Sequence, residues 1–138
     1  MTFRDFADAG ERLAPHLVEW VSQDNLVVAV APGGVPVATA ALASALLPAV
    51  DLHIATTELG VEVAGRTVVV IDDGVESGSA ARRIGQFLRT SGATFIVFAV
   101  PVCPAPELES LRELFDVVIT LDQPAERQPL RQHYERFE

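Results

Sequence analysis

Residues 68–80 read VVVIDDGVESGSA, and this stretch decides the fold. Its four leading β-branched residues form a short apolar run of the kind that is buried on both faces of a parallel sheet. The run stops at two carboxylates, Asp72 and Asp73, and small residues follow them. A helical pattern then places Ile84, Phe87 and Leu88 on one face. The stretch therefore predicts a buried strand, an acidic loop and the start of a helix.

The acidic loop carries groups that suit a phosphorylated sugar. The first amides of a helix lack partners within the helix, and the helix dipole adds partial positive charge there, which favours a phosphate. Gly78 lets the backbone approach an anion closely, and the hydroxyl groups of Ser77 and Ser79 can donate to it. Asp72 and Asp73, at the carboxyl end of the strand, can accept hydrogen bonds from a sugar diol. One loop could thus hold both the hydroxyls and the phosphate of one sugar.

The same stretch resembles the signature of the type I phosphoribosyltransferases, in which a hydrophobic run precedes two acidic residues, three spacers and Ser/Thr-Gly-small-Ser/Thr. The resemblance implies that Asp72 and Asp73 bind the ribose hydroxyls of phosphoribosyl pyrophosphate. It also implies that the following loop, residues 76–80, holds the 5′-phosphate, and that the substrate-binding residues here are Gly74, Val75, Ser77, Gly78, Ser79 and Ala80. Ala80 falls where the family usually has a second Thr, so one hydroxyl is missing unless Ser79 replaces it. Other α/β domains can also end a strand in Asp-Asp and begin a helix with a Ser cap.

A second glycine-rich turn follows the earlier apolar run Asn25 to Ala31. The paired Gly33 and Gly34 allow amides to face an anion, although a turn that needs positive φ explains them equally well. The segment from Gly33 to Ala38 resembles the pyrophosphate-binding loop of the same family, which implies that both glycines contact the pyrophosphate. Pro32 stands where that loop usually has Arg, so a guanidinium is lost and no amide replaces it.

The composition fits one acidic domain. At 138 residues with 49% hydrophobic content, the chain is expected to form a single domain over residues 1–138. Its 19 acidic residues against 10 basic ones argue against nucleic acid or an anionic membrane as a partner. All the basic residues are Arg, and the absence of Lys excludes a Walker-type phosphate loop and a pyridoxal phosphate Schiff base. Neither a membrane-spanning run nor a signal peptide is evident, so we expect a cytoplasmic protein.

Apolar runs and helical patterns alternate along the chain, which predicts an α/β fold. Strands are expected near residues 25–31, 51–57, 67–71, 95–100 and 116–121, and helices near residues 3–21, 37–47, 79–91 and 107–114. The tail, residues 123–138, is expected to dock as a helix through Tyr134 and Phe137. Right-handed crossovers then give a doubly wound parallel sheet of about five strands flanked by helices, similar to the type I phosphoribosyltransferase fold. The loops after Ala31 and Ile71 would lie side by side at the switch point.

Two functions fit these features. The first is an enzyme that binds phosphoribosyl pyrophosphate and transfers the phosphoribose to an unidentified nitrogenous base. For this enzyme the resemblance implies Mg²⁺ bound through the pyrophosphate, and it allows a homodimer. The second is a non-catalytic phosphoribose-binding, nucleotide-binding or scaffold protein of the same fold. Pro32, Ala80 and the short connection over residues 59–65, which is too short for the flexible lid of the family, favour the second.

The catalytic residues expected for the enzyme are Asp72, Asp73 and Glu76. The resemblance places a carboxylate at position 76 beside the purine in some phosphoribosyltransferases, where it exchanges a proton. A negative side chain near a helix N-terminus, worth about 0.3–1 kcal/mol, explains Glu76 equally well.

Overall fold

The structure, a computed structural model, describes residues 1–47, 50–56 and 59–138. Within these residues a single sheet contains the strands β1 (Leu26–Val30), β2 (Leu52–Ala55), β3 (Thr67–Ile71), β4 (Phe95–Val102) and β5 (Val117–Asp122). The strand order is β2-β1-β3-β4-β5, and every neighbouring pair is parallel. The prediction of an α/β fold with a parallel sheet of about five strands is confirmed.

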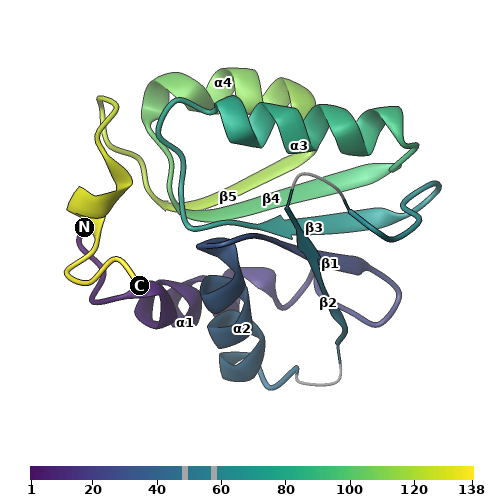
Figure 1. Ribbon diagram of the computed structural model, residues 1–138, viewed down its shortest axis with the longest axis horizontal. Helices are drawn as coiled ribbons and strands as arrows, with labels where there is room; N and C mark the ends of the chain where they lie inside the picture. Colours follow the sequence, from purple (N-terminus) through teal and green to yellow (C-terminus); the bar gives the residue numbers. More distant parts are fainter. Residues whose placement is uncertain (48–49, 57–58) are drawn as a thin grey trace.

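The α-helices of the described residues cover both faces of the sheet (Figure 1). On one face lie α1 (Phe6–Leu17) and α2 (Gly34–Ser44), and on the other lie α3 (Ser79–Thr90) and α4 (Ala105–Leu114). The two termini meet at one end of the molecule, next to the short 3₁₀ helix η1 (Leu130–His133) (Figure 1). The sheet is therefore doubly wound, as predicted. No helix in the described part of the chain is long and apolar enough to cross a membrane.

The central strands are apolar throughout because both of their faces are buried. Along β3, Val68 and Val70 point into the core beneath α3 and α4, whereas Val69 and Ile71 point into the core beneath α1 and α2. All four side chains are fully buried. Burial of a side chain of this size contributes about 1.5–3 kcal/mol, so β3 stabilises the packing of both layers.

The order of the strands reverses between β1 and β3. In this pair Leu26 lies opposite Val68, and Ala29 lies opposite Ile71. Because the strands are parallel and in this register, the turn after β1 and the loop after β3 leave the same edge of the sheet as neighbours. This is the switch point at which ligands of doubly wound sheets bind, and the expectation that these two loops lie side by side is confirmed.

Several segments differ from their sequence-based expectations; for example, α2 begins at Gly34 and ends at Ser44, and β4 continues through Pro101 to Val102. Helix α1 begins at Phe6 because the side chain of Asp5 caps it, accepting a hydrogen bond from the Asp8 amide at 2.8 Å. Strand β2 ends at Ala55, and the expected strand end at Thr57 lies outside the described residues.

The tail does not form the expected α-helix. It makes only η1 and an extended segment in which Tyr134 forms a parallel bridge with Phe3. Two prolines, Pro124 and Pro129, explain this difference, because proline in a helix interior removes a hydrogen bond and clashes with the preceding turn. Tyr134 is nevertheless buried, at 5% exposure, so the prediction that the tail docks through this side chain is confirmed.

Helices α1 and α2 cross closely at Gly10. A Cβ atom at this position would overlap the carbonyl oxygen of Val37 and lie 2.9 Å from the Cβ atom of Ala40. We expect Gly10→Ala to lower the free energy of unfolding by about 1–3 kcal/mol, because overpacking outweighs the gain of about 1 kcal/mol in helix propensity. Urea unfolding measures this change. Gly60→Ala is the control, since a Cβ atom there meets nothing within 4 Å; a Gly10→Ala protein as stable as wild type would contradict the crossing.

Candidate functional site

Two loops meet at the switch point because glycine occupies both contact positions of the first loop. A Cβ atom at Gly33 would overlap the carboxylate of Asp73, and one at Gly34 would lie 2.6 Å from the carbonyl oxygen of Ile71. Gly33 has a φ of −70°, and Gly34 is not among the residues with positive φ. The paired glycines are thus explained by close approach between the loops and not by a left-handed turn. The structure brings Gly33 and Gly34 together with the acidic pair.

Asp72 and Asp73 form a half-buried pair of carboxylates. The amide of Asp73 donates a hydrogen bond of 2.8 Å to Oδ1 of Asp72. Neither carboxylate takes part in an ion pair within the described residues. Burial, and then the neighbouring charge of Asp73, raise the pKa of Asp72 to about 8, and burial also raises the pKa of Asp73. Hydrogen-bond donors or a cation bound at the pair would therefore stabilise its ionised form.

The N-terminus of α3 lies directly after the pair and is open to solvent. Gly78 precedes the helix with a φ of +87°, which favours glycine. Because glycine has no side chain, this residue cannot cap the helix with one. Oγ of Ser77 accepts from the Ser79 amide at 3.3 Å and lies 3.1 Å from Oγ of Ser79. The amides of Ala80 and Ala81 have no acceptor among the residues that the structure describes. Two amides and two exposed hydroxyls are consequently available to an anion.

Arg82 supports this loop from behind. Its guanidinium donates to the carbonyl oxygen of Ser77 at 3.0 Å, to Glu107 at 2.6 Å and to Ser110 at 3.0 Å. Burial alone would raise the pKa of Glu107, but hydrogen bonds from Arg82 and Arg127 lower it below its ordinary value. Arg82 is thus held by α4 and connects α4 to the loop after β3.

The C-terminal tail holds the acidic loop from its other side. The hydroxyl of Tyr134 donates to the carbonyl oxygen of Asp73 at 2.6 Å, and the amide of Leu130 donates to Oε1 of Glu76 at 2.6 Å. The Leu130 side chain also lies against Gly74, where a Cβ atom would be 2.5 Å from Cδ2 of Leu130. The exposed Glu76 carboxylate is therefore held by a hydrogen bond from the tail. Val75, which was also predicted for the site, is buried.

Sequence reasoning missed this role of the tail. Tyr134 is the single tyrosine of the chain and stands in a polar segment, which is the one signal that could have indicated it. Burial, and then the charges of Asp73 and Asp72, raise the pKa of this hydroxyl, so it remains a donor at neutral pH.

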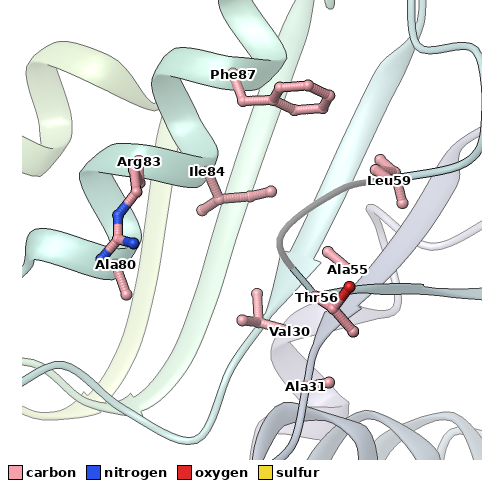
Figure 2. Close-up of a pocket in the computed structure, with 9 residues that line it drawn as sticks. All are labelled: Val30, Ala31, Ala55, Thr56, Leu59, Ala80, Arg83, Ile84 and Phe87. Atoms are coloured by element: carbon pink, nitrogen blue, oxygen red, sulfur yellow. The ribbon is translucent and has the colours of Figure 1, made fainter.

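A cavity of about 400 Å³ adjoins the loops on the side of α3. Ile84 and Phe87 of α3 lie across it from Val30 of β1 and Ala55 of β2 (Figure 2). The remaining lining residues are Ala31, Thr56, Leu59, Ala80 and Arg83. Of the residues predicted for the site, Ala80 alone lines this cavity, so the cavity was not anticipated from the sequence.

No protein-family model matches the chain. Over 77 residues, or 56% of this chain, it is 32% identical to a Mycobacterium tuberculosis protein named "putative phosphoribosyl transferase". The match covers 17% of the length of that relative. This relative therefore shares a segment with the chain, and its remaining length has no counterpart in the match.

Solved structures match over much more of the chain. The Thermus thermophilus protein TT1426 has a TM-score of 0.83 at 21% identity, covering 100% of this chain and 92% of its own. The Pyrococcus horikoshii purine phosphoribosyltransferase has a TM-score of 0.63 at 18% identity, with coverages of 94% and 97%. The M. tuberculosis orotate phosphoribosyltransferase in complex with 5-phospho-α-D-ribosyl 1-diphosphate has a TM-score of 0.65 at 22% identity, with coverages of 86% and 72%. The fold is that of the type I phosphoribosyltransferases, and the resemblance stated from the sequence is confirmed.

The half-buried acid pair predicts an unusual dependence of the free energy of unfolding on pH. Because the folded-state pKa of Asp72 is raised from 3.8 to about 8, the folded protein keeps a proton that the unfolded chain has released between these values. This contribution to stability is complete below about pH 4 and is lost as pH rises through about 8. Urea unfolding at pH 5, 7 and 9 should show that Asp72→Asn gains on wild type with rising pH, by on the order of a few kcal/mol.

The exposed Asp24→Asn substitution is the matched control and should keep the wild-type slope. If the curves of wild type and Asp72→Asn run parallel from pH 5 to pH 9, the acid pair does not hold the extra proton.

The hydrogen bond from Tyr134 to the acidic loop can be removed by a substitution that keeps the packing of the aromatic ring. Tyr134→Phe keeps the aromatic ring and leaves the Asp73 carbonyl without this donor. We expect the free energy of unfolding to fall by about 1 kcal/mol and the affinity for ribose 5-phosphate, measured by calorimetry, to fall as well. Thr94→Val removes a comparable hydroxyl-to-carbonyl bond, to Arg66, away from the site. It should reduce stability alone; equal affinity in the two variants would show that the tail does not position the loop.

Proposed function

We propose that this protein binds phosphoribosyl pyrophosphate and transfers its phosphoribose to a nitrogenous base. The observation that carries the proposal is the meeting of an unpaired acid pair with an open helix N-terminus, beside the glycines of the turn after β1. The shared fold supports it, because the phosphoribosyltransferases that resemble this chain include one in complex with 5-phospho-α-D-ribosyl 1-diphosphate.

Each part of the ligand would have its own place in the site. The 5′-phosphate would lie on Ser77, Gly78, Ser79 and Ala80, where free amides and hydroxyls are available. The ribose hydroxyls would donate to Asp72 and Asp73, and the pyrophosphate would approach Gly33 and Gly34. In this arrangement Gly74, Val75 and Glu76 shape the loop, and the contact from Leu130 to Glu76 fixes it.

The reaction would depend on positioning and on charge. The bond between C1′ and the diphosphate oxygen breaks, and the pyrophosphate leaves with the electron pair. The lone pair of the acceptor nitrogen forms the new bond to C1′, and a proton on that nitrogen, where there is one, passes to solvent. Because the sugar becomes cationic between these events, the ionised form of the acid pair would stabilise it electrostatically, while the loops hold the reactants in place.

The acid pair also fits Mg²⁺. Carboxylate oxygens and substrate phosphates are the ligands that this ion prefers, and the pair has no arginine partner within the described residues. The described residues contain no cluster of three or more His, Cys, Asp or Glu that could hold a metal alone. Asp72 and Asp73 would therefore hold Mg²⁺ together with pyrophosphate oxygens, and the bound ion would neutralise charge on the leaving group.

A specific observation favours a second function, a phosphoribose- or nucleotide-binding protein without catalysis. The turn after β1 carries Pro32 where a cation is expected, and Arg82, the basic residue nearest in sequence to the phosphate-binding loop, is held by Glu107. With a formal charge of −9, the chain offers little other attraction to a pyrophosphate group. Binding of the sugar phosphate needs only the helix N-terminus and the acid pair. Departure of pyrophosphate also needs positive charge beside the leaving group.

Two measurements test both functions. Calorimetry with phosphoribosyl pyrophosphate and Mg²⁺, and with ribose 5-phosphate, reports binding, and pyrophosphate release against a panel of bases reports turnover. We expect binding and turnover in wild type and a loss of both by at least about 100-fold in Asp72→Asn/Asp73→Asn, which corresponds to about 2.7 kcal/mol. Asp24→Asn should match wild type. Binding without turnover supports the second function, and the absence of binding contradicts both.

A further inference from the structure

A buried carboxylate that the proposed reaction does not use lies behind the loop after β3. Glu107, in the first turn of α4, is only 3% exposed. Its two oxygens accept hydrogen bonds from different arginines, Oε2 from Arg82 of α3 and Oε1 from Arg127 of the tail, both at 2.6 Å. Burial alone would raise the pKa of Glu107, but these two hydrogen bonds lower it, so the carboxyl is ionised at neutral pH. Two positive charges and one negative charge leave the cluster with a net charge of +1.

The guanidinium of Arg82 lies against the start of α3. Arg82 follows the first helical residue, Ser79, by three positions, and long side chains on a helix point toward its N-terminus. Nη1 of Arg82 donates to the carbonyl oxygen of Ser77 at 3.0 Å, and a Cβ atom at Gly78 would lie 2.9 Å from the same nitrogen. The positive charge of Arg82 is therefore next to the residues on which the 5′-phosphate is proposed to lie.

Glu107 would cancel this charge if it paired with Arg82 alone. A guanidinium and a carboxylate in contact are together neutral, so they attract an anion a few ångströms away only weakly. Residues 72–80 of the loop add acidic groups and no basic one. Arg127 pairs with the same carboxylate, and neither arginine pairs with another acid within the described residues. Arg127 therefore compensates for the charge of Glu107.

Contacts on both sides of Arg127 fix the part of the tail that carries it. Before it, the carbonyl oxygen of Pro124 accepts from the Ala105 amide, the first residue of α4, at 2.8 Å. After it, the Leu130 amide donates to Oε1 of Glu76 at 2.6 Å. The tail is thus held to α4 at one point and to the loop after β3 at the other, and Arg127 lies between the two.

We propose that Arg127 is a positioning residue that acts through charge: by compensating for Glu107, it leaves the positive charge of Arg82 available to the 5′-phosphate. The inference rests on the proposed function, because it requires the phosphate to lie on residues 77–80. Arg127 itself would not touch the ligand. The tail would then contribute to phosphate binding electrostatically, in addition to holding the loop through Leu130 and Tyr134.

Calorimetry with ribose 5-phosphate at two ionic strengths tests this role. At about 0.01 M salt, where the Debye length is about 30 Å, we expect Arg127→Gln to weaken binding by at least about three-fold, or about 0.7 kcal/mol. This loss should disappear at about 1 M salt, because the Debye length is then only about 3 Å. Arg127→Lys keeps the charge and should bind as wild type does. A loss caused by altered structure would instead persist at high salt.

A double variant separates charge from hydrogen bonding. Glu107→Gln/Arg127→Gln removes one charge of each sign, so the cluster again has a net charge of +1, and the affinity lost in Arg127→Gln should return. Arg66→Gln is the matched control because it changes the charge of the whole chain equally. Arg66 precedes β3 at the opposite edge of the sheet and takes part in no ion pair within the described part of the chain. Thermal unfolding checks that each variant is folded.

The outcomes separate this inference from the proposed function. If wild type binds ribose 5-phosphate and Arg127→Gln binds it equally well at low salt, the role of Arg127 is wrong and the proposed function stands. A loss that persists at about 1 M salt, or a folded double variant as weak as Arg127→Gln, overturns the role in the same way. If wild type does not bind ribose 5-phosphate, the proposed function falls, and this inference falls with it.

Discussion

The pairing of β1 with β3 is the constraint on which the rest of the structure depends. Both strands are buried on both faces, so their main-chain polar groups must find partners in the neighbouring strands. The parallel register that satisfies these groups also brings the glycine turn and the acidic loop to one edge of the sheet. The contact of Gly33 with Asp73 then allows no side chain between the loops. The site is in this sense a consequence of how the centre of the sheet is paired.

Among the residues that the structure describes, six arginines pair with acidic residues elsewhere and none pairs with Asp72 or Asp73. Asp8 pairs with Arg4 and Arg12, Glu107 with Arg82 and Arg127, and Asp116 with Arg89. The carboxylates at the switch point receive instead the amide of Asp73. Raised pKa values without a protein counter-ion are typical of functional sites, because a bound ligand there supplies the positive charge or the hydrogen-bond donors that the protein lacks.

The sheet and the loops at its edge could be predicted from the sequence because their signals are local. Runs such as Val68 to Ile71 indicate buried strands by themselves, and the right-handed crossover rule then fixes which loops meet. The role of the tail could not be predicted in this way. Tyr134 and Asp73 are 61 positions apart, and neither periodicity nor spacing connects them. The prolines that prevent a helix in the tail were visible, but the partner of the tail was not.

Two consecutive arginines on α3 show how the helix assigns different roles to identical side chains. Successive residues of an α-helix are rotated by about 100°, since a turn contains 3.6 residues. Arg82 therefore faces α4 and is held by Glu107, whereas Arg83 faces the ends of β1 and β2. Their order in the sequence does not reveal this difference, because it depends on which side of α3 has a helical neighbour. That side is set by the strand order. Because no described helix covers this face of β1 and β2, a cavity lies beside the loop after β3, and Arg83, which lines it, takes part in no ion pair within the described residues.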